Sequence, residues 1–263
     1  MCGSLFFRYR FHLLIVSASL LTALFLLMSR AWALSSKVWY LEMESASGGV
    51  YRVWLSSEHA RIDNGNFGYS LYASKEKNGW SILASRKDSR EQCRTSLKGF
   101  CDEYARLLKA GSVLDLNKPS KTTALKFDQG ALLGCTGNKC IFAGEQRAKD
   151  LFMSGEKPEK TDHYEVVYAN LPVPPEIAGL TCVLVNMPRL GGCVLQAHEY
   201  FADGRRCWIV RNRKLEILSD TAKVSALFQP PAGFKDVGKL ERRFLFKSVS
   251  GIMDDMAESL GHR

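Results

Sequence analysis

Two cysteines separated by four turn-forming residues are the part of the sequence whose residue types and spacing are compatible with a chemical function. The stretch ALLGCTGNKCIFAG, residues 131–144, contains Cys135 and Cys140. Such a pair could form a redox site, contribute to a metal site or form a structural disulfide. Redox activity favours C-x-x-C at the start of a helix, where the helix N-terminus stabilises the thiolate. A zinc site needs further ligands at finger-like spacing.

The residues around this pair favour the structural alternative. Residues 131–134 and 141–144 are short runs typical of strands, and the four residues between the cysteines favour a tight turn. Opposed residues of an antiparallel hairpin lie about 4.5–5.5 Å apart at Cα, within the roughly 4.4–6.8 Å that a disulfide spans. The sequence therefore predicts a Cys135–Cys140 disulfide, with redox chemistry, metal binding and pairing with other cysteines as alternatives.

The N-terminal segment is typical of an exported protein. Its first residues carry two arginines and no acid, residues 13–28 are an apolar run, and Ala31 and Ala33 form an A-x-A site. This order predicts a signal peptide over residues 1–33. The apolar run is shorter than the roughly 20 residues that span a bilayer, which disfavours the alternative of an uncleaved membrane anchor. We expect a periplasmic or secreted protein.

Residues 34–263 would form the exported part, with a length that suits one domain of good size or two small ones. Loss of three arginines would lower the net charge from +9 to +6, leaving 33 basic and 27 acidic residues. The basic residues are spread along the chain without a nucleic-acid-binding module, so no nucleic acid is predicted as a partner. The positive excess is compatible with peripheral contact with an anionic membrane.

Seven cysteines remain after residue 33, and an oxidising compartment should pair several of them. Because seven is odd, at least one stays free or pairs between molecules. The pairing of five of them stays open: Cys93, Cys101, Cys182, Cys193 and Cys207.

Asn-Gly and Asp-Gly dipeptides between β-rich runs predict antiparallel hairpins. They occur at residues 64–65, 78–79 and 203–204. The runs around them predict a five-stranded meander over residues 38–86 and further strands in 163–170 and 194–228.

Three segments predict helices. Residues 88–110 begin with Ser89 and Gln92, which resemble a capping box. Residues 174–187 and 250–260 also have helical patterns. The expected fold is mainly β (α+β): a strongly bent antiparallel sheet or unclosed β-barrel capped by two or three helices, in one domain with a loop-rich insert near 112–162.

Alternating apolar residues give the predicted meander one buried face. Helices could cover that face completely and form a core, or the sheet could curl around them incompletely and leave a cavity for an apolar ligand. The candidate ligand-binding residues on this face are Trp39, Leu41, Met43, Tyr51, Val53, Leu55, Tyr69, Leu71, Trp80 and Ile82.

Motifs for catalysis are absent from the sequence. It contains no G-x-S-x-G, H-E-x-x-H, P-loop or G-x-G-x-x-G motif. The histidines after residue 33 are widely spaced, and His198-Glu199 lies in a predicted strand, where neighbours face opposite ways. We therefore predict neither a catalytic residue, nor a cofactor, nor a metal site.

Two stretches resemble a known family. They are MESASGGVYRVWLSSEHARIDNGNFGYSLYASKEKNGWSIL, residues 43–83, and the C-terminal pattern VLQAHEYFADGRRCWIVRN followed by LFQPPAGFKDV. Together they are similar to the periplasmic lipoprotein-carrier (LolA-like) superfamily and its uncharacterised relatives. The resemblance implies an unclosed, bent antiparallel sheet with helices over it, which shelters acyl chains or another hydrophobic group. The seven cysteines and the insert near 112–162 depart from that pattern.

Three hypotheses follow for the function. The first is a non-enzymatic envelope protein that binds a lipid, an acyl chain or another hydrophobic ligand in a half-open β-barrel, with an envelope protein as a further candidate partner. The second is a disulfide-stapled structural or protein-interaction module without a ligand. The third is a thiol-disulfide oxidoreductase that uses Cys135 and Cys140.

Overall fold

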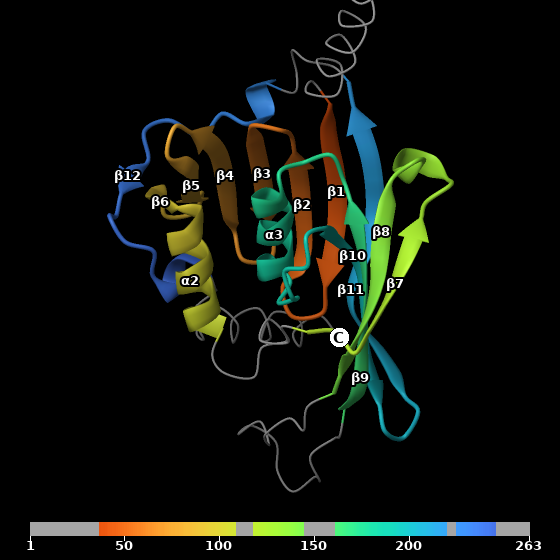
Figure 1. Cartoon of the computed structure of the whole chain (residues 1–263). Coiled ribbons are helices and arrows are strands. Elements are labelled where there is room, and N and C mark those ends of the chain that lie inside the picture. The colour runs from red at the N-terminus through yellow and green to blue at the C-terminus, as the bar shows by residue number, and fades with distance from the viewer. Residues whose placement is uncertain (1–36, 109–117, 145–160, 220–224, 246–263) are drawn as a thin grey trace, which may run out of the picture. The chain divides into compact units, whose positions relative to one another are not determined.

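Over the residues that the structure describes, the protein is mainly β, with one sheet of twelve strands that is mostly antiparallel and not closed, and three short helices (Figure 1). The computed structural model describes residues 37–108, 118–144, 161–219 and 225–245. The predicted fold class is thereby confirmed at the level of a mainly β, largely antiparallel structure.

The secondary-structure elements follow one another along the chain with these bounds: β1 (Val38–Ser45), β2 (Gly49–Leu55), β3 (His59–Asn64), β4 (Tyr69–Glu76), β5 (Gly79–Arg86), β6 (Glu91–Ser96), α2 (Leu97–Leu108), β7 (Lys121–Lys126), the 3₁₀ turn η2 (Gly130–Leu132), β8 (Thr136–Ala143), β9 (Thr161–Asn170), α3 (Pro175–Leu184), β10 (Cys193–Phe201), β11 (Arg206–Leu218), β12 (Lys235–Asp236) and α5 (Arg242–Leu245).

The strands lie in the order β12-β6-β5-β4-β3-β2-β1-β11-β10-β9-β8-β7. The predicted meander is confirmed as β1 to β5, each strand pairing antiparallel with the next. The C-terminal half joins it where β11 pairs with β1, from Val38 opposite Leu218 to Ser45 opposite Val210. One sheet therefore runs through both halves of the chain.

The two turns predicted inside the meander follow from their residue types. After β3, the Asn64 side chain accepts a hydrogen bond from the Phe67 amide at 2.8 Å and donates one to the Gly48 carbonyl at 2.9 Å. After β4, Glu76 pairs with Gly79 across a two-residue connection. Gly79 has a φ of 118°, which a residue without Cβ adopts at least cost.

The segment expected to be a loop-rich insert contributes strands to the sheet. Residues 121–126 form β7 and residues 136–143 form β8, which pairs with β7 on one side and β9 on the other. Much of the rest of this segment, residues 112–117 and 145–160, lies outside the described residues.

The helix predicted over residues 88–110 is wrong in its first part. Residues 91–96 form β6, which pairs with β5 from Glu91 opposite Arg86 to Ser96 opposite Ser81. The helix α2 begins only at Leu97, and its cap is Ser96, whose Oγ accepts a hydrogen bond from the Gly99 amide at 3.0 Å. Pairing with β5 outweighs the local helical pattern, so Ser89 and Gln92 do not form a capping box.

The helix predicted over residues 174–187 is confirmed as α3, which begins at Pro175 and ends at Leu184. The helix predicted over residues 250–260 lies outside the described residues.

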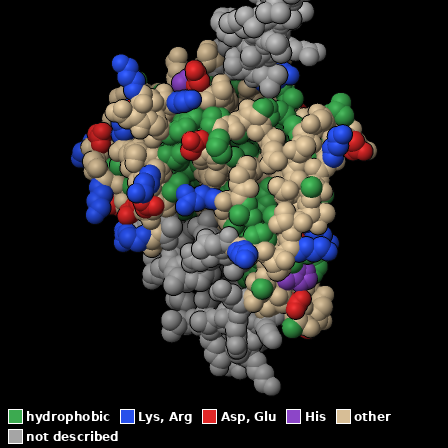
Figure 2. Space-filling model, viewed as in Figure 1, with side chains coloured by type: hydrophobic (Ala, Val, Ile, Leu, Met, Phe, Trp, Pro, Cys, Tyr) green, Lys and Arg blue, Asp and Glu red, His purple; other side chains and the backbone are tan. Residues whose placement is uncertain are grey.

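Both longer helices lie on the same face of the sheet (Figure 1). They contact each other, α2 also contacts β5 and β6, and α3 contacts β10. Figure 2 shows hydrophobic side chains gathered on this face over and beside α3, with Lys and Arg side chains along the margin near α2 and β12. The hydrophobic core thus lies between this face and the helices.

The carbonyl at the end of α3 is held by two tyrosines from different elements. The Tyr51 hydroxyl, from β2, donates to the Leu184 carbonyl at 3.1 Å, and the Tyr104 hydroxyl, from α2, donates to the same oxygen at 3.2 Å. This arrangement satisfies one of the carbonyls that a helix leaves unpaired at its C-terminus. It also connects the sheet, α2 and α3 at one point.

A third tyrosine lies close to these two hydroxyls but does not donate a hydrogen bond to the Leu184 carbonyl. The Tyr69 side chain, from β4, is buried, and its hydroxyl has no hydrogen-bond partner among the described residues. Burial raises the pKa of Tyr69 and of Tyr104 well above the ordinary value, and nearby Tyr51 raises both further. All three phenols are therefore neutral near neutral pH.

We predict that replacing Tyr51 or Tyr104 alone with Phe lowers the free energy of unfolding by about 1 kcal/mol. The double variant should lose more than the sum, because the Leu184 carbonyl then has no donor in an apolar interior, a loss of about 1–3 kcal/mol. Urea unfolding followed by circular dichroism measures these differences.

The matched control is Tyr69→Phe, which removes a buried hydroxyl that has no partner. Its free energy of unfolding should stay the same or rise. A loss from Tyr69→Phe as large as that from Tyr51→Phe, or strict additivity of the Tyr51 and Tyr104 variants, would contradict the shared carbonyl.

Candidate ligand-binding groove

The structure places all ten predicted ligand-binding residues on the buried face of β1 to β5. Their side chains belong to one hydrophobic cluster, and even the most accessible of them, Trp80, is only 8 % exposed. All ten belong to the core, and Trp80 also lines a groove. The residues of this cluster are Trp39, Leu41, Met43, Tyr51, Val53, Leu55, Tyr69, Leu71, Trp80 and Ile82.

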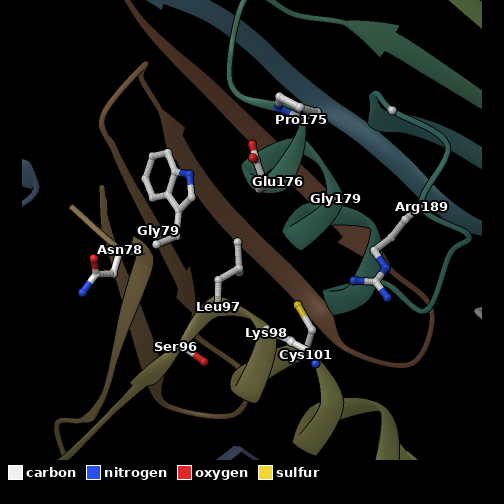
Figure 3. A pocket seen from close by; sticks show the side chains of 12 residues that line it. Asn78, Gly79, Ser96, Leu97, Lys98, Cys101, Pro175, Glu176, Gly179 and Arg189 are labelled. Atoms are coloured by element: carbon white, nitrogen blue, oxygen red, sulfur yellow. The ribbon is translucent and has the colours of Figure 1, made fainter. Parts of the chain in front are cut away.

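The groove lies where the β4–β5 hairpin meets the beginnings of α2 and α3 (Figure 3). Its volume is about 660 Å³, which is within the range of small-molecule sites, about 300–1,000 Å³. Its lining comes from four segments: Asn78, Gly79 and Trp80 of the hairpin; Ser96 at the end of β6 with Leu97, Lys98 and Cys101 of α2; Pro175, Glu176 and Gly179 of α3; and Arg189 and Gly191 of the loop after α3.

Local sequence determines where the two helices begin. Ser96 caps α2, and Gly99 packs so closely that a Cβ there would lie 2.7 Å from Thr95 Oγ1. Pro175 is at the first position of α3, where its missing N–H costs no helical hydrogen bond. Both beginnings lie at the groove.

The two helices run in the same direction away from the groove. The first half of α2 lines the groove together with Pro175 and Gly179 of α3, while Tyr104, later in α2, reaches Leu184 at the end of α3. The tyrosine-bound carbonyl therefore positions the far ends of both helices, and the groove lies at their N-terminal ends.

Gly179 keeps the groove open between the helices. It has no side chain, and a Cβ there would lie 3.4 Å from Cδ of Arg189. The aliphatic part of Arg189 thus lies against α3, and Figure 3 shows its guanidinium on the side of Cys101. Burial raises the pKa of the Cys101 thiol, and the charge of Arg189 opposes that rise.

The predicted Cys135–Cys140 disulfide is wrong. Residues 136–143 form the continuous strand β8, so Cys140 follows Cys135 after five steps of extended chain, roughly 16 Å at a rise of about 3.3 Å per residue. A disulfide spans less than about 7 Å at Cα. The structure contains no disulfide among its seven described cysteines.

The turn expected at residues 136–139 fails because these residues pair on both sides. Thr136 lies opposite Lys126 of β7 and opposite Asn170 of β9. Gly137 allows β8 and β9 to approach closely, since a Cβ at this position would lie 2.1 Å from the Tyr168 carbonyl oxygen. The chain turns earlier, after β7 and around η2.

The cysteines also lack the environment of reactive thiols. Burial raises the pKa of Cys135 and of Cys140, whereas an attacking thiol needs a lowered pKa. Burial raises the pKa of Cys182 to about 12, and that of Cys193 further. The Cys182 thiol donates to the Gly192 carbonyl at 3.2 Å. The buried cysteines therefore behave as apolar core residues.

Other classes of site have no support in the described ranges. Groups of three or more His, Cys, Asp or Glu side chains that could hold a metal ion do not occur there. Nor does any described helix have the length and apolarity to span a bilayer. His198 and Glu199 face opposite sides of β10, as predicted: Glu199 is buried, and it accepts hydrogen bonds from Thr161 at 2.6 Å and Tyr164 at 3.3 Å.

Comparisons with known proteins do not assign a family. The chain matches no protein-family model, and no curated protein sequence matches it significantly.

The groove is a site that sequence reasoning found only in part. Trp80 was among the predicted residues, but those from α2 and the segment 175–191 were not. They come together only when α2 and α3 pack side by side. The sequence signals that could have marked them are the serine before α2 and the proline at the start of α3, which place two helix N-termini.

We predict that the thiols differ sharply in reactivity. In the native protein at pH 8, iodoacetamide should label Cys207, which is exposed, at least about tenfold faster than Cys182 or Cys193, which are buried with raised pKa values. Mass spectrometry of tryptic peptides measures the rates.

The variant Cys207→Ser is the control and should abolish the fast labelling. A peptide map of the unreduced protein that joins Cys135 to Cys140 would contradict the continuous strand β8.

Proposed function

We propose that this chain is a non-enzymatic exported envelope protein that binds a lipid, an acyl chain or another hydrophobic ligand. In this proposal the sheet is a strongly bent, unclosed β-barrel with α2 and α3 as its cap. The observation that carries the proposal is the groove over Trp80 between the two helix beginnings.

The composition of the groove supports an apolar ligand. Its walls include the Trp80 indole, the half-buried Leu97 side chain and the buried Cys101 thiol. A ligand placed there would cover apolar surface at a gain of about 25 cal/mol per Å². The resemblance to periplasmic lipoprotein carriers, which shelter acyl chains, points in the same direction.

The proposed location rests on the sequence of residues 1–33, which lie outside the described residues. Export would place the groove where envelope lipids and lipoproteins are present. An envelope protein that delivers or accepts the ligand is the partner that this function requires.

A structural or protein-interaction module without a ligand is the second candidate. It is favoured by the burial of the other nine predicted residues under the protein's own helices. In that case the meander face is entirely core, and the groove is a surface depression. The oxidoreductase hypothesis has no comparable support, because Cys135 and Cys140 lie too far apart to exchange a disulfide.

We predict that wild-type protein binds a fluorescent fatty acid such as cis-parinaric acid and that Trp80→Ala weakens binding at least about tenfold. A tenfold loss corresponds to about 1.4 kcal/mol, which is within reach of losing one large aromatic contact. Fluorescence titration measures the affinity, and thermal unfolding shows whether the variant is folded.

The matched control is Trp54→Ala on β2, where the Trp54 ring lies tilted beside that of Tyr40, with centroids 5.3 Å apart, and faces away from the core cluster. Its affinity should equal that of the wild type. Absence of binding by the wild type, or equal weakening by both variants, would leave the module without a ligand as the better description.

A further inference from the structure

The charges around the groove are not balanced. Two cationic side chains, Lys98 and Arg189, line it together with one carboxylate, Glu176. No hydrogen bond or ion pair joins any of these three side chains to another described residue. Most arginines on the outer face of the sheet, by contrast, have partners: Arg61 pairs with Asp63 at 2.7 Å, and Arg211 with Glu44 at 2.5 Å.

The helix directions add to this positive excess. Both α2, with twelve residues, and α3, with ten, begin at the groove. A helix N-terminus carries the equivalent of roughly half a positive charge. The cap of α3 is Pro174, which has no side-chain group to accept a hydrogen bond from the first turn. Glu176 lies in that first turn and offsets part of this potential.

The position of Arg189 at the groove suits the binding of an anion. The stem of the exposed Arg189 lies against Gly179, which places its guanidinium at the edge of the groove (Figure 3). A guanidinium binds a carboxylate through two parallel hydrogen bonds. The apolar surfaces of Trp80 and Leu97 lie in the same groove.

We propose that the groove binds a single-chain fatty acid, with its carboxylate at Arg189 and Lys98 and its acyl chain along Trp80 and Leu97. This inference rests on the proposed function and adds the charge and size of the ligand. Two cations and one carboxylate leave one net positive charge, which matches a monoanion. A volume of about 660 Å³ suits one acyl chain rather than the two chains of a phospholipid.

The test compares four amphiphiles with the same twelve-carbon chain, using isothermal titration calorimetry on the exported protein. They are laurate, dodecyl phosphate, dodecanol and dodecyltrimethylammonium, each kept below its aggregation concentration. Laurate should bind at least about tenfold more tightly than dodecanol. Arg189→Gln should weaken laurate about tenfold while changing dodecanol less than twofold, and Lys98→Gln should have a smaller effect of the same kind.

The matched control is Arg52→Gln, which removes an exposed arginine of β2 that lies 3.8 Å from Glu42. It should leave all four affinities unchanged. Thermal unfolding confirms that each variant is folded, which is expected because Arg189 and Lys98 are exposed.

The outcomes separate this inference from the proposed function. Equal binding of laurate and dodecanol, unaffected by Arg189→Gln, would overturn the carboxylate site and leave an apolar ligand site in place. Tighter binding of dodecyl phosphate than of laurate would overturn the fatty acid in favour of a phosphate head group. Preference for the cationic amphiphile would overturn it in favour of Glu176. Failure of all four to bind would overturn both proposals.

Discussion

The arrangement of this protein depends on a single carbonyl oxygen at the end of α3. The Leu184 carbonyl lies in an apolar interior, where an unpaired acceptor costs about 1–3 kcal/mol. Tyr51 and Tyr104 both donate to it, one from the sheet and one from α2. Because three elements meet at this atom, the two helices keep a fixed direction relative to the strands. Their N-terminal ends, at the other end of the core, then define the groove.

The same alternation of apolar residues produces both the core and the groove. Along β5, the side chains of Trp80, Ile82 and Ala84 face the core cluster, and α2 lies against this strand. Near the hairpin the cover stops, because the helices begin there and Gly179 supplies no side chain. An apolar floor is thereby accessible beside positive side chains and positive helix ends. This combination is the basis for proposing a ligand with an apolar chain and an anionic head rather than a purely apolar one.

Burial in the core, and not disulfide bonding or redox chemistry, accounts for most of the cysteines. Seven cysteines after residue 33 of a chain predicted to be exported favour disulfides, yet the described cysteines form none in this structure. Several occupy inward-facing positions, such as Cys93 on β6, Cys140 on β8 and Cys193 on β10, where a small apolar side chain belongs to the core cluster. Their raised pKa values follow from that burial and oppose redox chemistry.

The sequence by itself determined the meander, its turns and its buried face, because period-two alternation and Asn-Gly turns act over a few neighbouring residues. It also determined α3, which begins at a proline. Only the tertiary structure decided that residues 91–96 extend the sheet, that residues 136–139 continue a strand, and that the buried face is mostly core. Each of these depends on pairing or packing with another element. Strand β6 pairs with β5, and β8 pairs with both β7 and β9. The buried face becomes core because helices pack over it. The free energy of strand pairing and of burial is gained only when these elements come together. The local propensities of the residues do not reveal it.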